Sequence, residues 1–134
     1  MNGKFIIYFD GSSIGNPGPS GCAYIIENQN GEVLHEEGIF IGESTNNVSE
    51  YRALIYALEK AKELGIKEIE LRTDSELIIN HLLGKYRVKS EKIIPLFKKV
   101  KEILKEFKWE IKKVSRKEMK RVDQIAFATA KGGS

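Results

Sequence analysis

The chain has 134 residues, 41% of them hydrophobic, so we expect one globular domain with a buried core rather than a disordered chain. Its single cysteine, Cys22, excludes an intrachain disulfide, and no apolar run is long enough to cross a membrane. We therefore expect a cytoplasmic protein without a membrane partner. The net charge is +3, but residues 1–84 carry 6 Lys/Arg against 13 Asp/Glu, whereas residues 85–134 carry 16 against 6. This asymmetry favours a polyanionic partner for the second half, and a solvated lysine-rich surface is the equally weighted alternative.

The first third of the sequence predicts three strands. Residues 4–9 form a short run of aromatic and β-branched side chains, and residues 21–27 and 32–40 also have strand character. The turn signal Asn28-Gln29-Asn30-Gly31 predicts a hairpin, so we expect the three strands to be antiparallel. Residues 11–21 contain four glycines and two prolines, which predicts a loop or a tight turn between the first two strands.

The remaining sequence predicts helices and further strands. Apolar residues spaced i, i+3, i+4 from Val48 to Leu58 predict a helix that ends at Gly65 and has Asn47 or a neighbour as its N-cap. Strands are predicted over residues 67–72 and 108–114, and helices over residues 75–83, 93–107 and 120–131. The order βββαβααβα indicates an α/β fold, with a five-stranded mixed sheet of three antiparallel and two parallel strands flanked by helices. We expect one domain over residues 1–130 and a flexible tail over residues 131–134.

Four carboxylates fall at the ends of these elements. Asp10 ends the first predicted strand and Asp74 ends the fourth, and a local right-handed crossover makes these two strands neighbours. We expect Glu50 and Asp123 in the first turns of two helices that lean over the same point. Oxygen ligands grouped in this way suit Mg²⁺ or Mn²⁺. Helix capping or pairing with the helix dipole is the alternative for any one of these acids alone.

Four sequence motifs resemble those of the ribonuclease HI family, in its compact form without a long basic insertion. They are Tyr8-Phe9-Asp10-Gly11-Ser12 with Gly15-Asn16-Pro17-Gly18, the segment 45–54, Thr73-Asp74-Ser75 and the segment 121–126, and they run in order along the chain. The resemblance implies a ribonuclease H-like fold and an endoribonuclease that cleaves the RNA strand of RNA–DNA hybrids. It also implies two Mg²⁺ ions, with Mn²⁺ as a substitute, and products with 5′-phosphate and 3′-hydroxyl ends.

The same resemblance assigns roles to ten residues. The catalytic and metal-binding carboxylates are Asp10, Glu50, Asp74 and Asp123. The nucleic-acid contacts are Gly11, Ser12, Asn16, Thr45, Asn46 and Asn47, and of these Asn16 and Thr45 match positions that hold a DNA phosphate. Amides and hydroxyls suit 2′-hydroxyls and minor-groove base edges, whereas turn formation and helix capping are the alternative for the Asn pair. We expect a monomer.

One departure from the family pattern concerns proton transfer. Many members have a histidine in a loop before the last helix, but residues 115–120 contain none. Glu118 is a candidate replacement, and a helix first-turn charge is its alternative role. The two histidines, His35 and His81, are expected to face solvent. A broader nuclease that also cuts double-stranded RNA stays open as an alternative. A catalytically silent hybrid-binding module is a further alternative, which the presence of all four carboxylates argues against.

Overall fold

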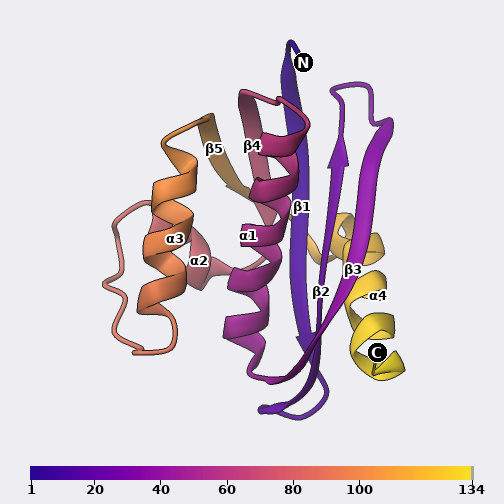
Figure 1. Ribbon diagram of the computed structural model, residues 1–134, viewed down its shortest axis with the longest axis vertical. Coiled ribbons are helices and arrows are strands. Elements are labelled where there is room, and N and C mark those ends of the chain that lie inside the picture. Colours follow the sequence, from indigo (N-terminus) through magenta and orange to yellow (C-terminus); the bar gives the residue numbers. More distant parts are fainter. Residues whose placement is uncertain (134) are drawn as a thin grey trace.

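The computed structural model in Figure 1 describes residues 1–133 and has the predicted order of elements. The strands are β1 Lys4–Ser13, β2 Gly18–Glu27, β3 Val33–Ser44, β4 Glu68–Thr73 and β5 Lys108–Lys113. The helices are α1 Asn46–Glu63, α2 Glu76–Leu82, α3 Ile94–Leu104 and α4 Arg116–Gly132. Within the described residues, the five strands form one mixed sheet in the order β3-β2-β1-β4-β5. The first three strands are antiparallel, and β4 and β5 run parallel to β1, as predicted.

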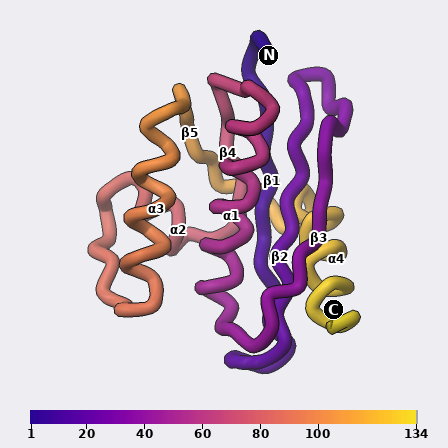
Figure 2. Tube along the Cα trace, viewed as in Figure 1, coloured from indigo at the N-terminus to yellow at the C-terminus, as the bar shows by residue number. Residues whose placement is uncertain are grey.

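Helices cover the two faces of the sheet unequally (Figures 1 and 2). On one face, α1 packs on β1 and β2, α3 packs on α1, and side chains from α2 join the same apolar cluster. On the other face, α4 packs on β1, β2 and β3 around a second, smaller cluster that includes Met119 and Val122. Side chains of β1 alternate between the two faces of the sheet, and those that face the larger core, Phe5, Ile7 and Phe9, are all buried.

The loop or tight turn predicted over residues 11–21 is shorter than expected, because only residues 14–17 connect the two strands. The glycines of this segment serve close packing between elements. A Cβ atom at Gly21 in β2 would lie 2.6 Å from the carbonyl oxygen of Ala126 in α4, and one at Gly11 would collide with the backbone of Ser49 and Glu50 in α1. These glycines therefore let helices approach both faces of the sheet at backbone distance.

Two helices begin earlier than the apolar pattern predicts. Helix α1 starts at Asn46 because the Thr45 hydroxyl, rather than Asn47, accepts from the Val48 amide (3.3 Å). Helix α4 starts at Arg116 because the Ser115 hydroxyl accepts from the Glu118 amide (3.3 Å). Glu50 and Asp123 consequently lie beyond the first turns in which they were expected.

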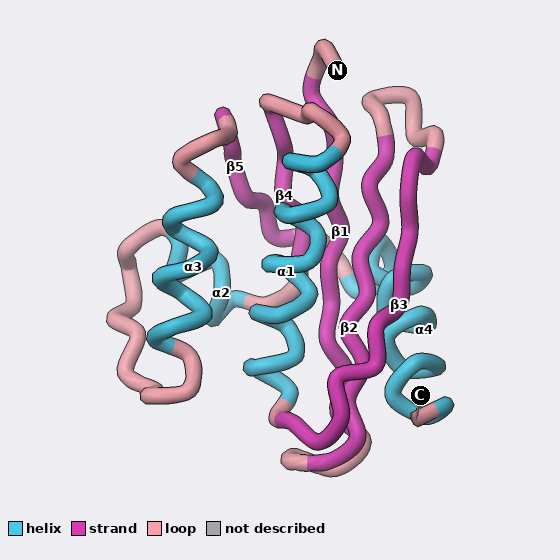
Figure 3. Tube along the Cα trace, in the orientation of Figure 1, coloured by secondary structure: helices cyan, strands magenta, loops and turns pink. Residues whose placement is uncertain are grey.

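The C-terminal segment is more helical than predicted. Helix α4 continues to Gly132, inside the segment expected as a tail, and Gly133 follows it in the left-handed conformation that commonly ends helices (φ 67°). Residue 134 lies outside the described residues. Figure 3 shows that the connection between α2 and α3 is the longest stretch of loop and that the other connections are short. Within residues 1–133, no helix has the length and apolarity needed to cross a membrane.

Candidate active site

Three of the four predicted carboxylates meet at one point. Strands β1 and β4 are adjacent and parallel, with Tyr8 opposite Arg72, so Asp10 and Asp74 two residues further on lie at the same level. Glu50 reaches the same point from α1. Carboxylate oxygens of Asp10, Glu50 and Asp74 all lie within 4.8 Å of one another. The strand order predicted from the sequence is therefore what brings these acids together.

Asp123 lines the same cleft from α4. It projects from α4 and lines the cleft together with Asp10, Glu50 and Asp74, but it stands outside the group of three whose oxygens lie within 4.8 Å. Its carboxylate is near enough to Asp10 to raise the pKa of that side chain. The cleft therefore has three acids on its floor, of which Asp74 is half-buried, and a fourth acid on its α4 side.

Close backbone packing fixes Glu50 against Asp10. Because Gly11 has no side chain, the first turns of α1 lie directly against β1 at the residue that follows Asp10. The Ser49 hydroxyl donates to the Asn46 carbonyl (2.8 Å), and the Cys22 thiol donates to the Ser49 carbonyl (3.1 Å). These contacts hold the helix segment that carries Glu50 against the sheet.

The crowded carboxylates on the floor of the cleft favour the binding of positive charge. Burial raises the pKa of Asp10 far above its ordinary value, and the neighbouring carboxylates of Asp123, Glu50 and Asp74 add to the rise. Burial also raises the pKa of Glu50 to about 7, with further contributions from Asp74 and Asp123. Among the described residues, no cation pairs with any of the four acids. A divalent cation would supply that charge, and carboxylate oxygens are its preferred ligands, so this set of residues fits such an ion.

Basic and aromatic side chains on α4 line the rim of this cleft. Arg116, Lys117 and Lys120 lie there, and among the described residues none of the three is in an ion pair. Phe127 also lines the cleft and is 53% exposed. The sequence analysis assigned the basic second half of the chain to a polyanionic partner but did not single out these residues. Their signal is helical spacing, because positions 116, 120, 123 and 127 share one face of α4.

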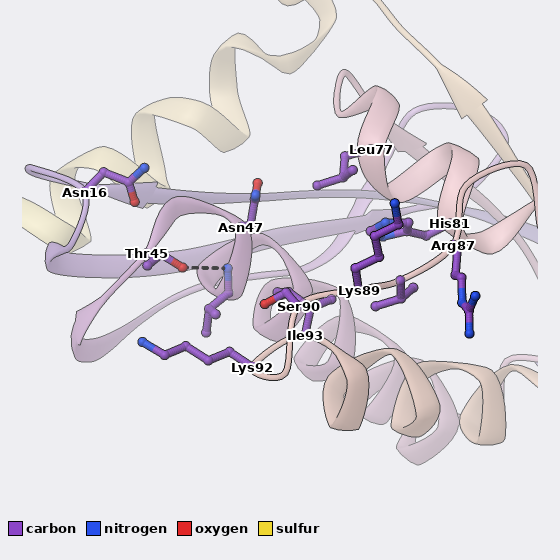
Figure 4. A pocket seen from close by; sticks show the side chains of 12 residues that line it. Asn16, Thr45, Asn47, Leu77, His81, Arg87, Lys89, Ser90, Lys92 and Ile93 are labelled. Atoms are coloured by element: carbon purple, nitrogen blue, oxygen red, sulfur yellow. Dashed lines mark hydrogen bonds between the residues drawn. The ribbon is translucent and has the colours of Figure 1, made fainter.

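The six predicted nucleic-acid contacts fall into two groups. Gly11, Ser12 and Asn46 line the acidic cleft. Asn16, Thr45 and Asn47 line a separate pocket on the other side of the first turn of α1 (Figure 4). Some of these side chains also have structural contacts: Thr45 caps α1, and the Asn16 side-chain oxygen accepts from the Asn46 amide (3.0 Å). The first turn of α1 thus divides two candidate binding surfaces.

Two other expectations change in the structure. Glu118 does not line the cleft, and its carboxylate instead lies 3.8 Å from the Arg72 guanidinium, which favours its role as a helix first-turn charge. His81 was expected to face solvent, but it is buried, with Nδ1 2.7 Å from the Tyr51 hydroxyl. The reason is that His81 shares the inward face of α2 with Ile78 and Leu82. His35 on β3 is partly exposed.

Comparisons with known proteins agree with this fold. Residues 8–129 match the family model described as reverse transcriptase-like. The crystal structure of RNase H1 from the halophilic archaeon Halobacterium salinarum superposes with a TM-score of 0.93 and 37% identity, over 97% of this chain and 99% of that chain. This chain belongs to the type 1 ribonuclease H family. The ribonuclease H-like fold implied by the sequence motifs is thereby confirmed.

Two further relatives define how far the likeness extends. The curated ribonuclease HI of Halobacterium salinarum is 38% identical over 125 residues, which are 92% of this chain and 63% of that protein. LC11-RNase H1, a type 1 ribonuclease H crystallised in complex with an RNA/DNA hybrid, is 37% identical with a TM-score of 0.90 over 96% of this chain and 97% of that chain. This ribonuclease H chain therefore spans less than two thirds of the curated relative but nearly all of the crystallised ones.

Proposed function

We propose that this chain is a metal-dependent endoribonuclease that hydrolyses the RNA strand of RNA–DNA hybrids and leaves 5′-phosphate and 3′-hydroxyl ends. The observation that carries this proposal is the cluster of Asp10, Glu50 and Asp74 within 4.8 Å, in a cleft with cations on its rim. A relative with the same fold, LC11-RNase H1, has been crystallised with an RNA/DNA hybrid. Phosphodiester hydrolysis at clustered carboxylates is the chemistry that joins these features.

The four carboxylates have the role of holding Mg²⁺, with Mn²⁺ as a substitute. In this proposal Asp10, Glu50 and Asp74 form the floor of the metal site, and Asp123 completes it from α4. When bound, a pair of divalent cations supplies an ionised water for attack and positive charge for the leaving 3′ oxygen. The protein's own task is to hold the carboxylates in place, which the packing of α1 on Gly11 achieves for Glu50.

Side chains around the floor have the role of orienting the substrate. The cations Arg116, Lys117 and Lys120 face the cleft without acidic partners among the described residues, so they are available for phosphates that flank the scissile bond. Ser12 and Asn46 offer a hydroxyl and an amide beside the carboxylates. Groups of this kind recognise 2′-hydroxyls, which distinguish RNA from DNA.

One assay tests this proposal. The chain is incubated with end-labelled RNA–DNA hybrid, duplex RNA and duplex DNA, each with Mg²⁺ and with EDTA, and an Asp74→Asn protein serves as the matched control. We expect cleavage of the RNA strand of the hybrid only, lost in EDTA and in the control. Equal cleavage of duplex RNA would instead indicate a broader nuclease, and tight hybrid binding without cleavage in Mg²⁺ or Mn²⁺ would indicate a silent binding module.

A further inference from the structure

An aromatic ring stands in the acidic cleft beside the fourth carboxylate. Phe127 follows Asp123 by four residues on α4, so the two side chains share one face of the helix and lie about 6 Å, roughly one turn, apart along its axis. Both line the cleft, and 53% of Phe127 is exposed. An uncharged, apolar side chain therefore lies next to the place at which a scissile phosphate would meet the carboxylates.

The ring of Phe127 is not part of the core. The inner face of α4 packs against the sheet through Met119, Val122 and Ala126, whereas neither apolar cluster of the described residues includes Phe127. Within residues 1–133, none of the aromatic or cation–π pairs involves its ring. The exposed part of the ring is therefore available to a ligand, and covering it would remove apolar area from water.

The α4 side of the cleft differs in charge before and after Asp123. The three rim cations line the cleft before Asp123 in the sequence, whereas the α4 residues that line it after Asp123 are Gln124 and Phe127, both uncharged. A nucleic-acid strand lying along this face would offer phosphates to the cations on one side of the cleavage point. On the other side α4 presents no charge to a phosphate, so its contact there is with another part of the nucleotide.

The part of a nucleotide that suits this ring is the sugar. Inside a duplex the bases are paired and stacked on one another, so a strand presents its sugars and phosphates to a protein that approaches its backbone. An aromatic ring without a polar group packs on the C–H face of a ribose, but it has no donor or acceptor for a phosphate or a 2′-hydroxyl. Phe127 is therefore suited to hold a strand in place, while Ser12 and Asn46 supply polar groups in the same cleft.

We propose that Phe127 packs against the ribose of the RNA nucleotide next to the scissile phosphate, on the side away from the rim cations, and thereby holds that phosphate among the carboxylates. This inference rests on the proposed function and deepens it, because it adds a contact to the RNA strand in the same cleft. The contact is uncharged, so the affinity that it supplies does not depend on the release of counterions. Its salt dependence distinguishes it from the contacts of the rim cations.

A salt titration tests the nature of the contact. Hybrid binding is measured with the Asp10→Asn protein, in which we expect no cleavage, and with the same protein carrying Phe127→Ala, Phe127→Tyr or Lys120→Gln. We expect Phe127→Ala to weaken binding about tenfold with an unchanged slope of log K against log salt, and Phe127→Tyr, which keeps the ring, to retain most of the affinity. Lys120→Gln should instead reduce the slope by about 1. The matched control is Val33→Ala, which truncates an apolar side chain of similar exposure, 49%, outside the cleft.

A map of the cut positions tests the place of the contact. Proteins with all four carboxylates cleave an end-labelled hybrid whose RNA strand stops short of the DNA strand at both ends, and the rate is measured below saturation at each RNA phosphodiester. We expect Phe127→Ala to slow cleavage about tenfold at internal bonds, and Val33→Ala to keep the wild-type map.

The expected signature lies at one end of the RNA strand. There the last bond lacks the neighbouring nucleotide that Phe127 would contact, so the wild type should cut it about tenfold more slowly, and Phe127→Ala should have little further effect. Extending that end by one abasic ribose should restore the internal rate in the wild type alone, because the sugar by itself makes the contact.

Three results overturn the ribose contact. The first is binding and cleavage that Phe127→Ala leaves unchanged, and the second is a loss that is equal at every bond up to both ends of the RNA strand, which would make Phe127 a structural residue. The third is an end effect that an abasic ribose does not relieve. All three leave the proposed function standing, because RNA cleavage depends on the carboxylates of the cleft. Failure of the wild-type chain to cleave any hybrid in Mg²⁺ or Mn²⁺ would instead remove the proposed function itself.

Discussion

Glu50 and Glu70 are both buried glutamates, 8% and 4% exposed, but their surroundings are opposite. The Glu70 carboxylate lies 2.6 Å from the Arg72 guanidinium and 3.3 Å from the ammonium groups of Lys4 and Lys112. Burial alone would raise the pKa of Glu70, but hydrogen bonds from these three cations outweigh it and lower the pKa to about 2. Glu50 has acids as neighbours instead, and its pKa rises to about 7.

The contrast separates a charge that stabilises the fold from one that the fold tolerates. The Glu70 carboxylate on β4 pairs with cations on the neighbouring strands β1 and β5. These contacts lie beside the strands that α4 covers. Among the described residues, Glu50 has no cation as a partner, so its burial lowers the stability of the fold. The rest of the core compensates for this loss. The same residue type in the same state of burial therefore has opposite effects, and its neighbours decide which. Destabilised buried acids of this kind are typical of functional sites.

The largest effect should follow from removing charge at the crowded cluster. Asp10→Asn deletes one carboxylate from the floor of the cleft with little change in volume. We expect hybrid cleavage to fall by several orders of magnitude, because a ligand of the metal site is lost. We also expect the metal-free protein to become more stable at pH 8, because repulsion among the acids is relieved. Cleavage rates and urea unfolding of the same preparation check both; an active Asp10→Asn protein would contradict the site.

Matched substitutions at the two glutamates should move stability in opposite directions. Glu70→Gln removes the buried negative charge shared by Arg72, Lys4 and Lys112, although the two lysines keep Glu110, so we expect the free energy of unfolding to fall by about 2 kcal/mol, with hybrid cleavage largely retained. Glu50→Gln should instead raise the free energy of unfolding in EDTA at pH 8 and abolish cleavage. The measurement is urea unfolding of both variants beside the wild type. A loss of stability in both would mean that neighbours do not govern these acids.

The pH dependence of stability should show both glutamates at once. The lowered pKa of Glu70 gives stability that is complete above about pH 4.5 and is lost as the pH falls toward 2. The raised pKa of Glu50 works the other way: its penalty is absent below about pH 4.5 and grows until about pH 7. The raised pKa of Asp10 adds a penalty of the same sign, which begins near its ordinary value of 3.8, so in EDTA we expect maximum stability near pH 4 to 4.5. Thermal unfolding across pH checks this, and Mg²⁺ should remove the decline on the alkaline side.

The smallest effect distinguishes cations without acidic partners from cations in ion pairs. A glutamine triple variant of Arg116, Lys117 and Lys120 should raise KM about tenfold with a smaller change in kcat, and should reduce the slope of log K against log salt by about 2 to 3. The control triple variant removes lysines that are in ion pairs, namely Lys62, Lys99 and Lys105. We expect the control to keep the wild-type slope. Equal slopes in all three proteins would reduce the α4 cations to a solvated surface.

Sequence patterns predicted the sheet and the meeting of Asp10 with Asp74, because both depend on strand order and on which residue ends each strand. Three features depended on contacts that no local pattern contains. The glycines at positions 11 and 21 resemble loop signals, although they are packing surfaces for helices. His81 is buried by tertiary packing of α2.

The charge asymmetry of the sequence was similarly ambiguous. Lys4 and Lys112 are engaged with Glu70 through strand pairing, whereas Lys89 has no acidic partner among the described residues. Only the register of β1, β4 and β5 distinguishes these lysines. One signal was readable and was missed: Ser115 and Glu118 have the spacing of a capping box, which marks the true start of α4.

The absence of a side chain at Gly11 affects how mutational data on this family are interpreted. Even a methyl group there would wedge α1 away from β1 and separate Glu50 from Asp10. In a saturation library selected for activity, position 11 would therefore tolerate as little as the acids themselves, although it has no functional group. Tolerance data alone would record it as a member of the reaction centre. A thermal-shift screen would tell it apart, since replacing Gly11 should cost stability and replacing the acids should not.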